Sequence, residues 1–414
     1  HRALIVPFVC LVVALFSNER IDINKGVMSQ AVSGTTELLH SNAQNIHGGK
    51  SYLKKRMKIL IVTHLFPKIS ETFVVNQIVQ LLQRGHSVSI WARKAGEEKV
   101  HEKVKEYKLI EKTYYKTLPA DIQSYDLIIC QFGPLGIEFL RHKQALHLKA
   151  KVVTFFRGFD ISRYLYENPG CYDSLFRYGD LLATSSNAFR ERLLELGADP
   201  KKTVVYYSSV DCSTFSYSEH SPSDKTIRIL TIGRLIEKKG MEDVITALNM
   251  VIPRYSDVYL TIVGEGDSRI KRKLKKLIHR LGIGNHITFA GECTQAEVIQ
   301  HLKNSHLFVL ASKTARNFDQ EGIPNVLKEA MAVGLPVITT RHGGIPEMVL
   351  DGINGYLVDE GRSDQIAKRI EYLIARPDLC KRVGVSARKT VEQMFESSHK
   401  GDELEQLLEQ LIAL

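Results

Sequence analysis

Apolar runs and amphipathic segments alternate along the chain from Met57 onward, and the alternation occurs twice. Residues Lys58–Thr63 form a continuous apolar run, as expected for a parallel strand buried on both faces. Residues Ser70–Arg84 follow with their apolar side chains on one helical stripe, and Gly85 ends the segment. The alternation restarts at Ile227–Ile232. Strands that alternate with helices of this length predict parallel sheets with right-handed crossovers. Two such runs therefore predict an α/β protein with two Rossmann-like domains that face a central cleft.

The same pattern predicts further elements in both halves of the chain. In the first half we expect strands at 86–91, 126–131, 151–154 and 181–184, and helices from Gly136 and over 187–196. In the second half we expect strands at 258–263, 287–290, 307–310 and 336–339, and helices over 241–251, 268–281, 294–303 and 325–333. We expect the chain to close with helices over 363–375, 377–394 and 400–411. The polar stretch Ser213–Lys225 contains Pro222 and lacks periodicity, so we interpret it as the linker between the halves.

The first 56 residues do not share this pattern. The apolar run Leu4–Phe16 is shorter than the roughly 20 residues that span a bilayer, and is near the length of a signal-peptide core. The polar residues that follow show neither helical nor strand periodicity, and Met57 then heads a new apolar run, as cytoplasmic α/β domains often begin. We interpret residues 1–56 as an upstream or disordered lead outside the fold. The alternative is a short membrane anchor.

Composition narrows the class of protein. The 414 residues are 44% hydrophobic and 25% charged, which excludes a disordered tail protein, a collagen-like fibre and a polytopic membrane protein. The net charge of +10 is spread along the chain, and its single Trp is not part of an aromatic and basic stripe, so we expect no nucleic-acid partner. The six cysteines lie far apart with no C-x-x-C pair, which predicts free thiols rather than disulfides or a zinc site.

The densest group of candidate site residues is EGIPNVLKE, which runs from Glu321 to Glu329. Pro324 is of the type favoured at the first helical position, so we expect a helix from about this residue whose free N–H groups bind phosphate. Gly322 lets the backbone approach a ligand closely. The two carboxylates flank this start and can accept hydrogen bonds from sugar and ribose hydroxyls. The alternative is an ordinary solvated helix start with two surface glutamates.

A second candidate is the turn GRLIEKKG, Gly233–Gly240, which lies between a strand and a helix. Arg234 and Lys239 emerge at the carboxyl end of the strand, where Arg binds phosphate bidentately and Lys acts as a point charge. Such a turn predicts a diphosphate clamp that needs no metal, although it is not a P-loop. The alternative is a solvated basic loop. We interpret the glycine-rich segments Gly264–Gly266 and His342–Gly344 as turns.

EGIPNVLKEAMAVGLPVITT, together with GRLIEKKG, resembles the retaining glycosyltransferases of family 4, which have the two-domain GT-B fold. The spacing of Glu321 and Glu329 is that family's E-x(7)-E hallmark, and RHGGIPEMV and DGINGYLV match its next two blocks. In the first half, HLFPKISETFVVNQI, CQFGPLG and RGFDIS resemble the colanic acid and amylovoran branch, which builds bacterial exopolysaccharides. The resemblance covers essentially all of 57–414.

The resemblance implies a domain plan and roles for individual residues. It implies an acceptor-side domain at 57–215, a nucleotide-sugar-binding domain at 216–390 and a C-terminal helix at 391–414. Arg234 and Lys239 would hold the donor diphosphate in place of a metal. Glu329 would bind the ribose, and Glu321 would bind hydroxyls of the transferred sugar as a catalytic residue. The residues at the loop and helix start that would cradle the phosphate are Gly322, Ile323 and Asn325.

Two further candidate catalytic residues lie in the first half. Asp160 matches the acidic residue of the family's H-G-x-D block and would face the donor sugar or the acceptor. The chain departs from the family here, because the position expected to be His holds Arg157. A guanidinium can donate a hydrogen bond to a sugar hydroxyl, but it cannot serve as a base.

From the resemblance we predict a retaining hexosyltransferase without metal or other cofactor. Its expected substrates are a nucleotide sugar and a lipid-linked oligosaccharide, and its expected location is the cytoplasmic face of the inner membrane. Electrostatic stabilisation of the departing phosphate and front-face attack by the acceptor would account for catalysis. The alternatives are an inactive homologue, a nucleotide-sugar epimerase or phosphorylase of the same architecture, and a nucleotide-binding module.

The helix expected at Arg269–Arg280, RIKRKLKKLIHR, carries one apolar stripe and is basic over much of its remaining surface. A helix of this kind can lie on an anionic membrane, which would give peripheral contact with the inner membrane. The alternative is that the stripe packs against a sheet and that the basic face is simply solvated.

Overall fold

The computed structural model describes residues 56–97, 100–220 and 226–413. The sequence interpretations for residues 1–55, and for the part of the linker at 221–225, lie outside the described residues. Two sheets form the core, and every strand pair within them is parallel. The predicted α/β class with two parallel-sheet domains is therefore confirmed.

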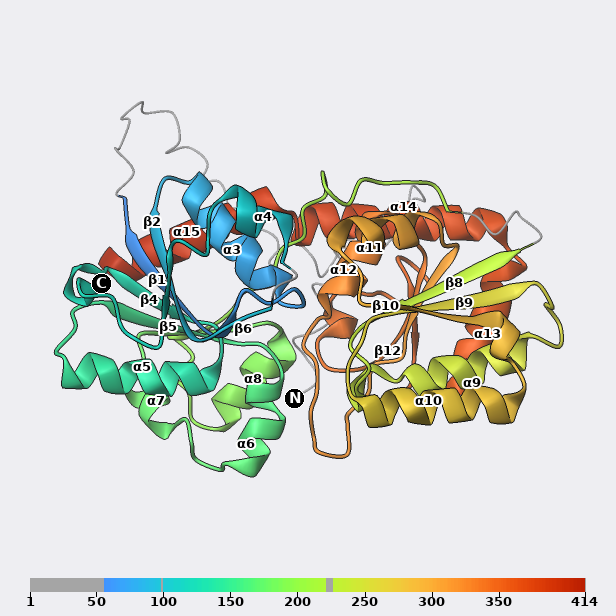
Figure 1. Cartoon of the computed structure of the whole chain (residues 1–414), viewed down its shortest axis with the longest axis horizontal. Coiled ribbons are helices and arrows are strands. Elements are labelled where there is room, and N and C mark those ends of the chain that lie inside the picture. The colour runs from blue at the N-terminus through green and yellow to red at the C-terminus, as the bar shows by residue number, and fades with distance from the viewer. Residues whose placement is uncertain (1–55, 98–99, 221–225, 414) are drawn as a thin grey trace, which may run out of the picture. The chain divides into compact units, whose positions relative to one another are not determined.

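The first sheet has seven strands in the order β3-β2-β1-β4-β5-β6-β7. These are β1 Lys58–Phe66, β2 Ser87–Ala95, β3 Thr113–Tyr115, β4 Leu127–Cys130, β5 Lys151–Phe156, β6 Leu181–Thr184 and β7 Thr203–Val205. Its helices are α3 Thr72–Gln83, α4 Glu102–Glu106, α5 Gly133–Ala145, α6 Arg163–Glu167, α7 Asp173–Tyr178 and α8 Asn187–Glu195. Successive residues of β1 point to opposite faces, so Ile59 and Ile61 pack with α3 while Leu60 and Val62 pack with α5 (Figure 1).

The second sheet has six strands in the order β10-β9-β8-β11-β12-β13. These are β8 Ile227–Ile232, β9 Val258–Val263, β10 Ile287–Gly291, β11 Leu307–Leu310, β12 Val337–Thr340 and β13 Tyr356–Val358. The helices that follow are α9 Met241–Val251, α10 Ser268–Leu281, α11 Gln295–Lys303, α12 Asn325–Ala332, α13 Ser363–Ile374 and α14 Pro377–Met394. One face of the sheet is covered by α9, α10 and α13, and the other by α11, α12 and α14 (Figure 1).

In each sheet the strand order reverses beside the first strand of that sheet. The reversal lies between β1 and β4 in the first sheet and between β8 and β11 in the second. Ligands of such sheets bind at this point, outside the carboxyl ends of the strands. The topology therefore directs attention to the loops that follow β4, β5, β8, β11 and β12.

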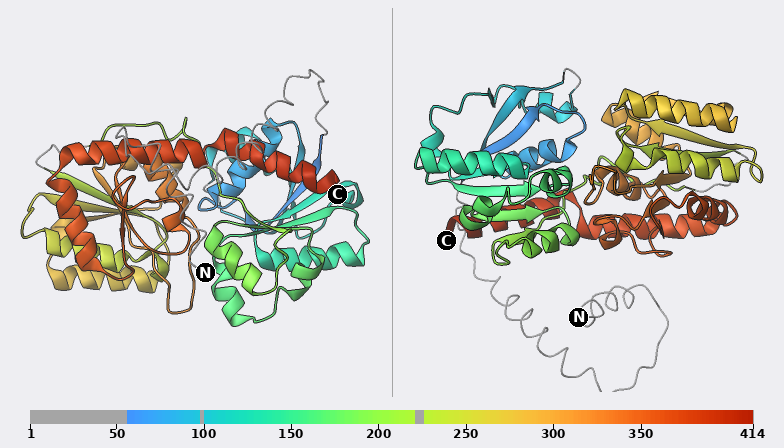
Figure 2. Two further views of the ribbon diagram at one scale, coloured as in Figure 1. Left: turned by 180° about the vertical axis from the view of Figure 1, so that it is seen from behind. Right: turned by 90° about the horizontal axis from the view of Figure 1, so that it is seen from below.

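The chain crosses between the two sheets twice. The first crossing follows β7, and the second joins α14 to the last helix, α15 Ser397–Ala413, which packs against α3 (Figure 2). The crossings are bonded to each other, because the Val210 amide donates to the Phe395 carbonyl and the Ser397 amide donates to the Val210 carbonyl, at 2.9 and 3.0 Å. No helix in the described ranges is both long and apolar enough to cross a membrane.

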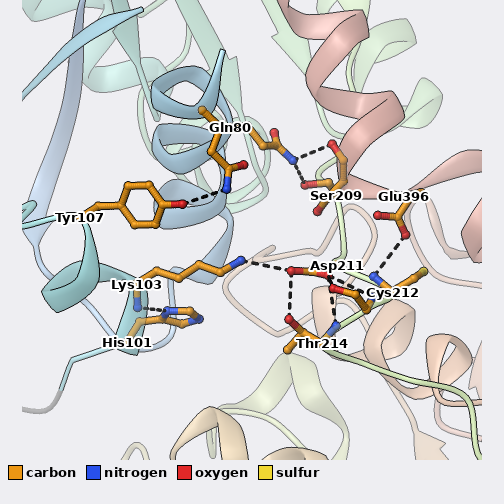
Figure 3. A network of polar contacts seen from close by, with 12 residues as sticks. Gln80, His101, Lys103, Tyr107, Ser209, Asp211, Cys212, Thr214 and Glu396 are labelled. Carbon is orange, nitrogen blue, oxygen red and sulfur yellow. Dashed lines mark hydrogen bonds and ion pairs between the residues drawn. The ribbon is translucent and has the colours of Figure 1, made fainter. Parts of the chain in front are cut away.

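Polar side chains of the first domain hold the first crossing in place (Figure 3). Gln80 on α3 donates to the Ser209 hydroxyl at 2.9 Å and to the Ser397 carbonyl at 3.0 Å. This one side chain therefore binds both connections between the sheets. Lys103 pairs with Asp211 at 3.2 Å, and the same carboxylate accepts from the hydroxyl of Thr214. These contacts fix the path of the connection between the two sheets.

The cysteine prediction is confirmed for Cys130, Cys171, Cys212 and Cys380, which are free thiols.

Candidate active site

A pocket of about 1310 Å³ lies outside the carboxyl ends of both sheets. Its lining draws on the loops after β1, β4 and β5 of the first sheet and after β8, β9 and β11 of the second. Most of the site residues predicted from the sequence line it, namely Arg157, Arg234, Lys239, Glu321, Gly322, Ile323, Asn325 and Glu329. The remaining one, Asp160, is fully buried and does not.

Glu321 is held by two side chains that come from the ends of neighbouring strands. Lys239, in the turn after β8, lies with its Nζ 2.7 Å from Oε1, and Ser312, just after β11, donates its hydroxyl to Oε2 at 2.8 Å. Burial alone would raise the pKa of Glu321, but the charges of Lys239 and Lys238 and the hydrogen bonds lower this pKa to about 2. Glu321 is therefore an ionised, acceptor-only group at any physiological pH.

The backbone of Glu321 is positioned by a histidine that the sequence did not single out as a site residue. The Glu321 amide donates to Nε2 of His342 at 3.0 Å, so this nitrogen carries no proton and the proton sits on Nδ1. Nδ1 then donates to Glu360 at 2.6 Å, and the second carboxylate oxygen of Glu360 accepts from the Thr314 amide at 2.8 Å. The ring is buried, so the loop that carries Glu321 is fixed from behind.

Two amide variants of His342 test its two hydrogen bonds one at a time, because each can replace only one of the ring nitrogens. In His342→Gln the side-chain oxygen can occupy the Nε2 position and still accept from Glu321, whereas His342→Asn keeps only a donor toward Glu360. If Glu321 is the catalytic residue that the family resemblance implies, His342→Asn should lower kcat by about tenfold, because the Glu321 amide loses its acceptor and the Glu321 carboxylate shifts. We expect the glutamine variant to retain most of the activity, with KM for the donor little changed in both. Equal kcat in the two variants would contradict this role.

The N-terminus of α12 faces the pocket and has no side-chain cap from its N-cap residue. Pro324 has φ −60° and ψ 129°, so it caps the helix, and the first helical residue is Asn325, as in the helix predicted over 325–333. No side chain in the described part of the chain caps the first N–H groups of α12. The Leu327 amide donates to the Pro324 carbonyl at 3.1 Å, so the Asn325 and Val326 amides are the ones available to an anion. The structure adds a reason for glycine at position 322, because a Cβ there would lie 2.3 Å from the Ser185 hydroxyl of the first domain.

Glu329 lies deeper on α12 and differs from Glu321 in protonation. It is half-buried, and burial raises its pKa to about 7, against the opposing charges of Lys328 and Lys239. Neighbouring Lys328 is buried and donates to Asn325 and to the carbonyl of Ser208, and burial lowers its pKa to about 7. Glu329 therefore changes its charge close to neutral pH.

The titration of Glu329 predicts pH-dependent binding of a nucleotide sugar. If Glu329 binds the ribose, as the family resemblance implies, its ionised carboxylate would accept hydrogen bonds from both ribose hydroxyls, and binding would favour the deprotonated form. Because the pKa of the free protein's Glu329 lies at about 7, affinity should rise by about tenfold between pH 6 and pH 8. Calorimetric titration measures this, with Glu329→Gln as the control that removes the slope. A slope that persists in Glu329→Gln would assign it to another group.

The basic residues of the turn after β8 differ in whether a carboxylate already pairs with them. Lys238 and Lys239 are paired, and Arg234 is not paired with any described residue. Arg234 is exposed, lines the pocket and forms no ion pair with the described residues. Lys238 is buried and is already engaged by Asp319 at 2.9 Å and by the Gln320 carbonyl at 3.0 Å. Arg234 is thus the basic group of this turn that is free to bind an anion.

Asp160 lies beneath the loop after β5 and is saturated by backbone donors. Its carboxylate accepts from the amides of Gly133, Arg157 and Gly158 at 3.0, 3.0 and 2.8 Å. It therefore fixes the loop that carries Arg157 and the start of α5, and it does not reach the pocket. The sequence prediction that Asp160 faces donor or acceptor has no support in this geometry.

Arg157 occupies the floor of the pocket in the first domain. Its Nη2 donates to Gln131 Oε1 at 2.8 Å, and its guanidinium carbon lies 4.5 Å from the centre of the Phe73 ring and 4.6 Å from that of Phe155. Burial lowers the pKa of Arg157 to about 10, so the group stays charged at neutral pH.

Comparisons with known proteins agree with one another. Residues 215–390 match the family described as Glycosyl transferases group 1. The Salmonella typhimurium protein WcaL, whose name assigns it to colanic acid biosynthesis, is 30% identical over 85% of this chain and all of its own length. The amylovoran biosynthesis glycosyltransferase AmsK of Erwinia amylovora is 29% identical over 86% of this chain and all of its own.

Two solved structures with a similar fold illustrate the architecture. HepE of Anabaena, crystallised with UDP and glucose, superposes with a TM-score of 0.72 at 19% identity, over 86% of this chain and all of HepE. The lipopolysaccharide outer core galactosyltransferase WaaB superposes with a TM-score of 0.62 at 18% identity, over the same share of this chain and all of WaaB.

Proposed function

The chain belongs to the Glycosyl transferases group 1 family and has the GT-B fold, and from this premise we propose that it transfers a hexose from a nucleotide sugar to a saccharide with retention of configuration. The observation that carries the proposal is one pocket lined by the Glu321–Lys239 pair, the uncapped start of α12 and the unpaired Arg234. HepE, crystallised with UDP-glucose, supports the class of donor. The names of WcaL and AmsK support a role in exopolysaccharide biosynthesis. We propose in addition that the acceptor is a lipid-linked oligosaccharide, as the family resemblance implies.

The proposed mechanism assigns each group by its charge. Arg234, Lys239 and the first amides of α12 neutralise the donor diphosphate, Glu321 accepts from hydroxyls of the transferred sugar, and Glu329 accepts from the ribose. The acceptor hydroxyl attacks from the face that the leaving phosphate vacates, its proton passes to that phosphate, and the sugar–phosphate bond breaks as the glycosidic bond forms. These cations supply the stabilisation of the leaving group, so we propose that transfer needs no metal and persists in EDTA.

A thermal-shift titration of the full chain tests the donor site. A ligand that binds only the native state at a hundredfold excess over its Kd stabilises it by about 2.7 kcal/mol. We expect stabilisation by one of UDP, GDP or their sugars, not by NAD, and loss of that shift in Glu329→Ala. Stabilisation by NAD alone would contradict the proposal, and nucleotide binding without turnover would favour an inactive homologue.

We further propose that the protein works at the cytoplasmic face of the inner membrane and contacts it through charge alone. The apolar stripe of α10 packs in the core of the second domain, because Leu274 and Ile278 are buried there beside α9. These two side chains are therefore not available to insert into a membrane. The basic residues of α10 that are exposed and form no ion pair with described residues are Arg272, Lys275, Lys276 and Arg280.

We expect this basic face of α10 to bind anionic vesicles in a salt-dependent way. Each exposed Lys or Arg near such a surface contributes about 1 kcal/mol, so changing the four residues to Ser should weaken binding by at least about 100-fold. Cosedimentation with vesicles that contain phosphatidylglycerol measures this. Binding that survives both high salt and the substitutions would contradict it.

A further inference from the structure

The floor of the pocket contains a cation without a counter-ion. Arg157 forms no ion pair with the described carboxylates, and its Nε is buried without a hydrogen-bond partner. Its polar contact is Nη2 with the neutral oxygen of Gln131. Phe73 and Phe155 cover the guanidinium and stabilise it partly through their ring faces, but they accept no N–H.

The nearby carboxylates are already committed to other donors. Asp160 accepts from three backbone amides, and Glu71 pairs with Lys68 at 2.7 Å. Gln131 cannot turn to offer more, because its amide nitrogen donates to Gln77 at 2.6 Å. A half-buried charge without a counter-ion is unfavourable in the free protein. An anion in the pocket would compensate the charge by contact with the part of the guanidinium that is not buried.

Arg157 reaches the pocket from the other domain than the groups assigned to the diphosphate. It follows β5 of the first sheet, whereas Arg234, Lys239 and α12 all belong to the second. Its loop touches the loop that carries Glu321, because the Gln320 amide donates to the Ser162 hydroxyl at 3.1 Å. Arg157 therefore lines the pocket on the side of the sugar-binding Glu321.

We propose that Arg157 binds a carboxylate on one of the two sugar substrates, so that this enzyme acts on a hexuronic acid. The inference rests on the proposed function. A guanidinium matches a carboxylate in a bidentate geometry, whereas a neutral hexose would leave the charge uncompensated. The acid belongs either to the transferred sugar or to the acceptor, since the pocket must hold both beside Glu321.

Three pairs of probes, two for the donor and one for the acceptor, distinguish these sources. Calorimetry on the full chain compares UDP-glucose with UDP-glucuronic acid, and GDP-mannose with GDP-mannuronic acid, for the donor. With UDP or GDP saturating, methyl glucuronide is compared with methyl glucoside for the acceptor. We expect at least about tenfold tighter binding of the acid in one arm, as a charge-assisted bidentate contact provides.

Variants assign the preference to Arg157. Arg157→Gln should abolish the preference for the acid, and Arg157→Lys should keep part of it, while binding of UDP or GDP alone stays unchanged in both. Arg93→Gln is the matched control, because Arg93 lines the same pocket but pairs with Glu138. Equal binding of acid and neutral sugar in both arms, or a preference that survives in Arg157→Gln, overturns the inference alone. Failure of every nucleotide to bind overturns the proposed function, and the inference with it.

Discussion

Replacing Glu321 with glutamine should lower the rate of sugar transfer by about 100-fold or more, while nucleotide binding changes little. Glutamine has the shape of glutamate but lacks its negative charge, which is fully developed at neutral pH because the pKa of Glu321 lies at about 2. Loss of one preorganised electrostatic group at a reacting centre typically costs a factor on the order of 10²–10³ in kcat. Transfer of a radiolabelled sugar from the donor measures the effect.

Glutamine rather than alanine is the informative substitution at this position. Lys239 and Glu321 are both nearly buried, with side chains 10% and 11% exposed. Deleting the carboxylate would leave Lys239 unpaired, and breaking a buried pair in this way costs about 3–5 kcal/mol of stability. Glutamine keeps one oxygen that can accept from Lys239, and its amide nitrogen can donate to the Ser312 hydroxyl. A melting temperature close to that of the wild type therefore separates lost chemistry from lost folding.

The control for this experiment is Glu371→Gln, which neutralises a carboxylate paired with Arg254 on the surface of α13. We expect normal transfer there. Near-normal transfer in Glu321→Gln would remove Glu321 from the reaction, even if the chain still binds a nucleotide.

The long strands and helices could be predicted because each contains enough residues to show the hydrophobic periodicity of its type. The buried runs β1, β8 and β9 and the striped helices α3, α9 and α10 all appear where the sequence predicts them. The strands β3, β7 and β13 were missed. Each has three residues and lies at the edge of its sheet, so it forms by pairing with one neighbour and carries no periodicity of its own.

Some residues of the candidate site could likewise be predicted from local sequence patterns, whereas others depend on tertiary contacts. Arg234, Lys239 and Glu321 were found because each lies in a distinctive segment that follows a strand, and parallel topology brings those strand ends together. The role of His342 depends on β12 lying beside β11, which no local pattern contains. A polar residue two or three positions after a predicted strand was nevertheless a usable signal for both Ser312 and His342.

The backbone saturation of Asp160 was beyond sequence reasoning. Its three donors come from two loops, one after β4 and one after β5, and their convergence is a property of the folded sheet. A family motif marks the residue but does not say whether its oxygens face a ligand or the chain.

Arg234→Ala should weaken nucleotide binding by about 10- to 100-fold and leave stability unchanged. Charged hydrogen bonds such as those between Arg and phosphate contribute about 1.5–3 kcal/mol, and each 1.4 kcal/mol is tenfold in Kd. Arg234 is exposed and unpaired among the described residues, so its removal leaves no carboxylate without a partner. Removal of Lys239, in contrast, would leave Glu321 without its ion pair. Surface substitutions of this kind usually change stability by less than about 0.5 kcal/mol.

Calorimetric titration with UDP or GDP measures the loss, and Arg316→Ala is the matched control. Arg316 is an exposed arginine of the neighbouring loop that pairs with Glu237 and does not line the pocket. The two variants remove the same charge from the same side of the protein, so a long-range electrostatic effect would weaken binding in both. Weaker binding in Arg234→Ala alone would show direct contact with the diphosphate. Equal affinity in Arg234→Ala and the wild type would leave Lys239 and the α12 amides as the whole diphosphate site, and Lys239 would then have to give up Glu321 whenever donor binds.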